Sequence, residues 1–112
     1  MPSITITGSD PATGNLTLSD NGITNANRTQ VVTWIIGPAS GVSSITSITN
    51  KATSNDVFNP DPAKLPGAST NWQGTVNPPQ TTTLPTTESY TICWNDSSGN
   101  NHCYDPQIRV NT

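Results

Sequence analysis

The stretch that decides the fold is residues 90–110, which read Tyr-Thr-Ile-Cys-Trp-Asn-Asp-Ser-Ser-Gly-Asn-Asn-His-Cys-Tyr-Asp-Pro-Gln-Ile-Arg-Val. Asp96 at the first position of a turn and Gly99 at the fourth are typical of a type I turn followed by a left-handed residue. This pattern predicts a hairpin with a three-residue loop, Ser97 to Gly99. Asp96 then faces Asn100, and each step outward matches one residue on each strand.

This register places Cys93 directly opposite Cys103. Opposed residues at a non-hydrogen-bonded position lie about 4.5 Å apart at Cα, which a disulfide tolerates. A two-residue loop, Ser98-Gly99, would instead pair Cys93 with Tyr104 and put the two sulfurs on opposite faces. The predicted disulfide therefore requires the three-residue loop, and if one of the two is wrong the other is wrong as well. The wide spacing of the cysteines lacks the C-x-x-C pattern of redox enzymes, which favours a structural disulfide.

Alternation along the hairpin assigns its two faces. The inward face is apolar and comprises Tyr90, Ile92, Trp94, Tyr104, Pro106, Ile108 and Val110. The outward face comprises Thr91, Cys93, Cys103, Asp105, Gln107 and Arg109.

Further strands are predicted along the rest of the chain. Residues 3–7 and 16–18 alternate with period two, and a turn cluster follows each. Residues 29–36 form the most apolar segment and predict a central strand, with Trp34 in the core. Residues 72–76 predict another short strand.

Two segments are less regular. Val42, Ile45 and Ile48 are spaced by three, which allows one helical turn, but the Ser- and Thr-rich surroundings favour an irregular strand. Phe58 stands alone in a Pro- and Asp-rich segment and is expected to fill the core from a loop. Residues 77–89 predict an exposed, extended Pro/Thr-rich connection.

The composition agrees with an all-β chain. Ser, Thr and Asn make up well over a third of the 112 residues, and these residue types have weak helix propensity. We therefore expect residues 1–112 to form a single antiparallel β-sandwich domain of about seven strands.

Charge and hydropathy exclude two classes of partner. The net charge is −3, and the four basic residues are scattered singly, so no basic stripe is present to bind nucleic acid. The longest apolar stretch, residues 31–36, is too short to cross a bilayer. We expect neither nucleic acid binding nor membrane insertion.

Catalytic and metal-binding patterns are mostly missing. With one histidine, His102, and two cysteines, the chain has too few ligands for a blue-copper or structural zinc site. His102 is expected on the face opposite Cys103, so no catalytic triad is predicted. An active site joining His102 to Asp105 or Glu88 also conflicts with the alternation. We expect a non-enzymatic protein without a cofactor.

Calcium binding stays open at this point. Five aspartates lie in predicted turns, where a carboxylate either binds a cation or caps its own backbone, and capping is the commoner role. These residues are Asp10, Asp20, Asp56, Asp61 and Asp96.

Aromatic residues suggest a second type of function. Trp72, Trp94 and Tyr104 could form a platform for a sugar or another small ligand, with Asn101 and His102 donating hydrogen bonds to it. The alternative is that these rings pack in the core and that the polar neighbours only solvate a loop.

The order of several motifs resembles a group of small bacterial proteins with a copper-free immunoglobulin- or cupredoxin-like sandwich. The matching segments are residues 31–34, 41–45, 55–58, 71–76, 90–92 and 104–110, the last of which reads Tyr-Asp-Pro-Gln-Ile-Arg-Val. The resemblance implies an Ig-like or cupredoxin-like fold and brings no activity or catalytic residues.

The cysteine pair favours an oxidising compartment, because a domain of this size gains much from one disulfide. The N-terminus lacks the charged and apolar regions of a signal peptide, so the chain either stays inside the cell or begins after a removed leader. We expect an extracytoplasmic location, secreted or at the cell surface, with a cytoplasmic one as the alternative.

Together these observations predict a non-enzymatic β-sandwich module for protein or surface contacts or self-assembly. Charge-poor, Thr-rich strands leave sheet edges that other copies could pair with, giving a homo-oligomer or a filament. A surface glycan is the other expected partner. The alternative function is a small-ligand or glycan-binding, lectin-like domain.

Overall fold

The computed structural model describes residues 3–51, 56–67 and 69–112, which fold into ten β-strands. Within these residues no helix forms that is long and apolar enough to cross a membrane. The strands are β1 (Ser3–Ser9), β2 (Leu16–Leu18), β3 (Ile23–Ala26), β4 (Val31–Ile36), β5 (Val42–Asn50), β6 (Ala63–Lys64), β7 (Trp72–Thr75), β8 (Thr86–Asp96), β9 (Asn101–Tyr104) and β10 (Gln107–Val110).

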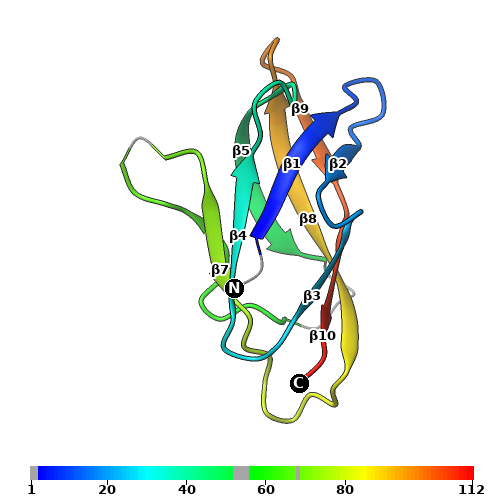
Figure 1. The fold of residues 1–112 in the computed structure, drawn as a ribbon, viewed down its shortest axis with the longest axis vertical. Coiled ribbons are helices and arrows are strands. Elements are labelled where there is room, and N and C mark those ends of the chain that lie inside the picture. Colours follow the sequence, from blue (N-terminus) through cyan, green and yellow to red (C-terminus); the bar gives the residue numbers. More distant parts are fainter. Residues whose placement is uncertain (1–2, 52–55, 68) are drawn as a thin grey trace.

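Two mixed sheets form the sandwich (Figure 1). The first sheet has the order β2-β1-β4-β7-β6, and the second has the order β3-β10-β8-β5, with β9 also paired to β8. The predicted all-β sandwich is confirmed, but the expected seven antiparallel strands are ten, and β1/β4 and β3/β10 pair in parallel. Turn patterns reveal antiparallel neighbours, whereas these parallel partners are distant in sequence and leave no local signal.

The predicted hairpin register is confirmed. Cys93 pairs with Cys103 and Trp94 with His102. The same register continues after Asp105 and Pro106, where β10 pairs with the first half of β8. The inward residues Tyr90, Ile92, Trp94, Pro106, Ile108 and Val110 are buried, and Tyr104 is half-buried.

Two bulges explain the three-residue apolar spacing of β5. The pairing of β5 with β8 shifts between Val42 and Ser44 and again between Ile45 and Ser47. Each shift adds one residue, so Val42, Ile45 and Ile48 all reach the inward face and are buried. The irregular strand is therefore confirmed.

The two inserted residues complete the β8 hydrogen bonds that the bulges interrupt. The Ser43 hydroxyl donates to the carbonyls of Asn95 and Asp96 at 3.2 and 3.0 Å. The Thr46 hydroxyl donates to the Cys93 carbonyl at 3.0 Å. Hydroxyl side chains at these positions thus satisfy carbonyls that a regular ladder would have paired.

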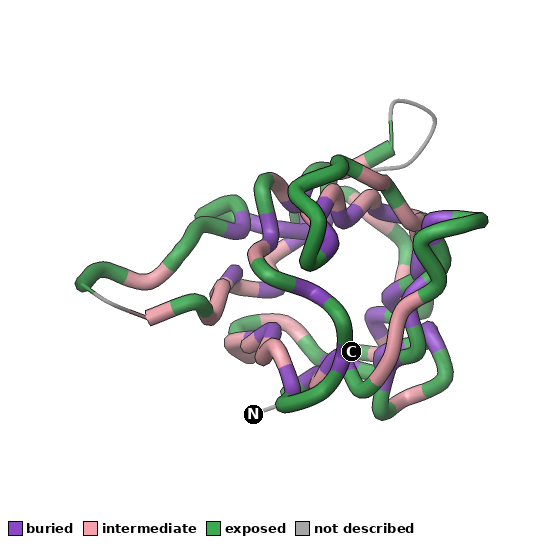
Figure 2. The backbone as a smooth tube through the Cα atoms, turned by 90° about the horizontal axis from the view of Figure 1, so that it is seen from above, coloured by how far each residue is buried: buried purple, intermediate pink, exposed green. Residues whose placement is uncertain are grey.

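Three rings form the centre of the core between the sheets. Trp34, Phe58 and Tyr90 lie edge to face with centroids 5.6 to 5.9 Å apart. The Trp34 indole donates to the Tyr90 hydroxyl at 3.2 Å, and burial raises the pKa of that hydroxyl. Phe58 reaches the core from outside the main strands, as predicted. Figure 2 shows how buried and exposed positions alternate along the chain.

The predicted exposed connection at residues 77–89 is wrong at both ends. Its last four residues belong to β8, which begins at Thr86. At its start Pro78 is buried, and the Arg28 guanidinium donates to the carbonyl of Pro78 and, at 3.2 Å, to that of Pro79. Leu84 packs against the core. A distant arginine holds the segment, and its Pro/Thr-rich composition gives no sign of that contact.

Candidate functional site

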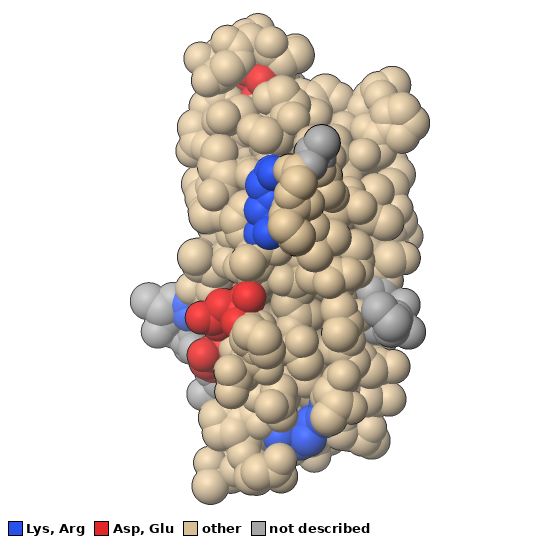
Figure 3. Space-filling model, turned by 90° about the vertical axis from the view of Figure 1, so that its left-hand side faces the viewer, with Lys and Arg blue, Asp and Glu red and all other residues tan. Residues whose placement is uncertain are grey.

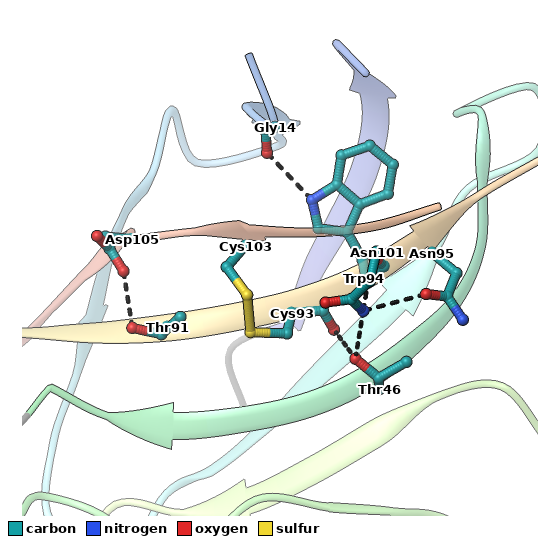
Figure 4. Close-up of a disulfide and its surroundings, with 9 residues drawn as sticks. All are labelled: Gly14, Thr46, Thr91, Cys93, Trp94, Asn95, Asn101, Cys103 and Asp105. Atoms are coloured by element: carbon teal, nitrogen blue, oxygen red, sulfur yellow. Dashed lines mark hydrogen bonds between the residues drawn. A yellow bond between two sulfur atoms is a disulfide. The ribbon is translucent and has the colours of Figure 1, made fainter. Parts of the chain in front are cut away.

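Trp94, the first residue of the expected aromatic platform, is fully buried. Its indole N–H donates to the Gly14 carbonyl at 3.1 Å, as Figure 4 shows. Gly14 has a φ of +82°, and a side chain there would lie 3.3 Å from the Cys103 carbonyl. Glycine therefore permits the loop to approach the hairpin, and the loop leaves no ring face of Trp94 for a ligand.

The other predicted residues are also used within the fold. The Asn101 amide donates to Thr46 Oγ1 at 3.1 Å, to the Trp94 carbonyl at 3.3 Å and to Asn95 Oδ1 at 3.0 Å. Tyr104 and Trp72 are half-buried and pack against the core. Trp72 lies in β7 of the first sheet, whereas the other platform residues lie in the second sheet. The predicted platform does not form, because the inward face of the hairpin is core.

His102 joins an acid that the sequence reasoning missed. Its Nε2 lies 2.9 Å from Oδ2 of Asp96, and its ring packs on Trp94 with centroids 4.7 Å apart. Hydrogen bonds from His102 and from the backbone N–H groups of Asn100 and Ser98 lower the pKa of the Asp96 carboxyl. The signal was present: the predicted register puts Asp96 and His102 on one face as diagonal neighbours.

This pair is placed to hold the hairpin together. Asp96 is 5% exposed and fixes the loop, since one carboxylate oxygen accepts the Ser98 and Asn100 N–H groups and the other contacts His102. Within the described residues His102 forms no contact with a hydroxyl or thiol nucleophile. The arrangement supports a structural role for the imidazole.

The disulfide lies on the outward face of the second sheet (Figure 4). Cys93 and Cys103 are joined with Cα atoms 4.0 Å apart, which confirms the predicted bridge. Next to it the Asp105 carboxylate accepts the Thr91 hydroxyl at 2.7 Å and pairs with Lys51 at 3.0 Å. The Thr91 hydrogen bond and the Lys51 charge lower the pKa of Asp105.

Most of the turn aspartates bind their own backbone. Asp10 accepts the Ala12 N–H, Asp20 the Gly22 N–H and Asp56 the Phe58 N–H, at 2.9 to 3.1 Å. Asp96 does the same in the hairpin loop. Within the described residues no three His, Cys, Asp or Glu side chains gather as metal ligands. The geometry of these turns is that of backbone capping.

A cleft of about 430 Å³ opens between residues 56–59 and 77–80. Its lining consists of Asp56, Phe58, Asn59, Asn77, Pro78, Pro79 and Gln80. A second hollow of about 350 Å³ shares Asp56 and is lined also by Asp61, Pro62 and residues 48–50 of β5. None of the cleft residues except Asp56 and Phe58 was singled out from the sequence, because the cleft joins two loops with no recognisable motif.

Backbone hydrogen bonds fix the two walls of this cleft to each other. The Asn77 N–H donates to the Val57 carbonyl at 2.9 Å, and the Asn59 N–H donates to the Thr75 carbonyl at 2.9 Å. Phe58 pairs with Val76 in an isolated bridge. Arg28 holds the outer part of the second wall through the Pro78 and Pro79 carbonyls. The cleft is therefore built into the scaffold.

The charge on this part of the surface is acidic and sparse. Asp56 and Asp61 are exposed, and no basic residue lines the cleft or the neighbouring hollow. Figure 3 shows acidic side chains gathered in one small area, with Lys or Arg side chains above, beside and below that area on the same face. A carboxylate of a ligand in the cleft would meet the Asp56 carboxylate among the lining residues, while the Arg28 guanidinium is bonded to the Pro78 and Pro79 carbonyls of the outer wall.

No protein-family model matches this sequence, and no curated protein is significantly similar to it. The site is therefore interpreted from its own geometry.

Proposed function

We propose that this chain is a non-enzymatic interaction module that acts outside the cytoplasm, through contact with another protein surface or with a second copy of itself. The observation that carries this proposal is the outer face of the first sheet. Strands β1, β2, β4 and β7 contain no charged residue, and the charge nearest to this face among the strands of the sheet is Lys64 on the edge strand β6.

The side chains on this face are small, uncharged and often β-branched. They are Ser3, Thr5, Thr7, Thr17, Val31, Thr33, Ile35, Gln73 and Thr75. Val31 and Ile35 lie along the central strand β4, with Thr5 opposite Ile35 and Thr75 opposite Val31. Association with a similar face would remove apolar surface from water without desolvating any charge.

The face is a better candidate for self-association than the sheet edges named in the sequence-based prediction. The edge strands β2, β3, β6 and β9 have only three, four, two and four residues. The remaining edge strand, β5, carries two bulges. Short and bulged edges are the devices by which β proteins prevent edge-to-edge pairing.

The disulfide supports a location in an oxidising compartment. A Cys93–Cys103 bridge across two strands persists where thiols are not kept reduced, as in secreted and surface proteins. This location and the interaction role are parts of the same proposal.

Sedimentation equilibrium over a concentration series tests the self-association that the face would allow. Ile35→Lys introduces a charge at the centre of the face and is expected to weaken association by about tenfold or more, because the ammonium would have to be desolvated. Gln107→Lys is the matched control, since Gln107 is exposed on the outer face of the second sheet. A wild-type chain that stays monomeric throughout, or equal effects of the two lysines, would refute association through this face.

A further inference from the structure

We propose that the cleft between residues 56–59 and 77–80 binds an uncharged ligand with several hydroxyl groups, such as one or two sugar rings of a glycan. This site differs from the aromatic platform that the sequence suggested. It is also separate from the outer face of the first sheet, so either proposal can fail without the other.

The first support is a set of polar side chains that form no hydrogen bond within the fold. Within the described residues the side-chain amides of Asn59, Asn77 and Gln80 form no hydrogen bond, although all three line the cleft. Elsewhere the Gln73 amide donates to Thr33 and the Gln30 amide oxygen accepts the Asn27 N–H. Other exposed amides of the described residues, such as that of Gln107, also form no hydrogen bond, but around this cleft three of them lie together.

The second support is the position of the single carboxylate. Asp56 Oδ1 accepts the Phe58 N–H and the Asn50 side-chain amide, at 3.1 and 3.3 Å. Oδ2 has no partner within the described residues, while the bonds to Oδ1 fix the orientation of the carboxylate. A carboxylate held in this way is a strong acceptor for a hydroxyl group of a ligand.

The chemistry of the lining selects the ligand class. A hydroxyl group both donates and accepts, and three amides plus one carboxylate offer both donors and acceptors around one cleft. The exposed Pro79 adds apolar ring surface for the C–H groups of a sugar. The volume of about 430 Å³ lies within the range of small-ligand sites. The acidic rim disfavours uronic acids and other anionic sugars.

The third support is preorganisation. Backbone hydrogen bonds join the two walls and Arg28 holds the outer part of the second wall, so little conformational entropy is lost when a ligand binds. Binding should therefore leave the sandwich unchanged and affect only the cleft.

The test is an NMR titration of the full chain, followed in backbone and side-chain amide spectra. The probes are methyl α-mannoside, methyl β-galactoside, N-acetylglucosamine and cellobiose, with glucuronate as the anionic comparison. We expect at least one neutral probe to shift the backbone amides of residues 56–59 and 77–80 and the side-chain amides of Asn59, Asn77 and Gln80. Glucuronate should shift them less at the same concentration.

Two variants make the result specific. Gln80 is exposed and its side chain forms no hydrogen bond within the described residues, so Gln80→Ala should fold normally and bind the responsive sugar about fivefold more weakly. Gln107→Ala, at an exposed glutamine on the second sheet, should bind as the wild type does. The proposal is overturned if no neutral sugar shifts the cleft at millimolar concentrations, if the shifts map elsewhere, or if Gln80→Ala binds unchanged. Stronger binding of a lysine-containing dipeptide than of any sugar would also overturn it, and would assign the cleft to peptides.

Discussion

Removing the Cys93–Cys103 bridge should lower stability by an amount that follows from the length of its loop. The two cysteines are ten residues apart in sequence, and closing a loop of this size removes about 9 cal/mol/K of entropy from the unfolded chain in the chain-entropy model. That corresponds to about 2.8 kcal/mol at room temperature. For 112 residues the unfolding entropy is about 0.24 kcal/mol/K, so the melting temperature should fall by about 12 °C.

The variant for this measurement replaces both cysteines by alanine, which leaves no free thiol. Urea unfolding gives the free energy and the m-value, and thermal melting gives the temperature shift. Reductant should destabilise the wild type by a similar amount and leave the double variant unaffected, which is the internal control.

A loss below about 1 kcal/mol with an unchanged m-value would refute the loop-entropy reasoning, because it would mean that the unfolded chain is not constrained by the bridge. Free thiols in the purified wild type would refute the bridge itself.

Two further predictions concern β5 and the hairpin. Thr46→Val should lower the unfolding free energy by about 1 kcal/mol, because the Cys93 carbonyl loses its hydrogen-bond donor at the bulge. Thr49→Val, at an exposed threonine of the same strand, is the control and should have little effect. Urea denaturation of both variants tests this prediction. The pKa of Asp96 is lowered in the folded state, so the stability from its ionised form is present above its ordinary pKa of 3.8 and is lost as the pH falls through that value toward the folded pKa. Urea midpoints measured from neutral pH down to about pH 3 should therefore fall more steeply for the wild type than for Asp96→Asn, and parallel curves would show that ionisation of Asp96 is not coupled to folding.

Features that depend on residues close together in the chain could be predicted from the sequence, and features that join distant segments could not. The hairpin register, the disulfide and the buried face of β8 and β10 were all predicted, because the turn at Asp96 and Gly99 and the alternation after it are local patterns. The strand at Val31–Ile36 was predicted for the same reason. β3 and the two-residue β6 were missed, since neither shows a clear alternation of apolar residues.

The candidate sites were harder to predict than the strands. Of the two alternatives for the aromatic residues, the structure has the core packing: alternation predicts that Trp94 faces inward, whereas the loop around Gly14 that closes over it has no local signal in the sequence. The predicted register already makes His102 and Asp96 diagonal neighbours, whereas Asp105, the acid considered from the sequence, lies on the outward face. The cleft could not have been found, because residues 56–59 and 77–80 approach each other only after β7 pairs with β4.

The sequence by itself determined an all-β chain, a disulfide-linked C-terminal hairpin and a scarcity of charge. The first and last follow from composition, and the hairpin follows from turn residues and alternation, which are patterns of a few neighbouring residues. Only the tertiary structure decided which strands pair in parallel and which polar side chains around the cleft form no hydrogen bond. It also decided that Ser43 and Thr46 are the bulge residues, which brings Val42, Ile45 and Ile48 to one face. These features depend on packing between segments that are distant in sequence, and no local pattern reports the free energy of such contacts.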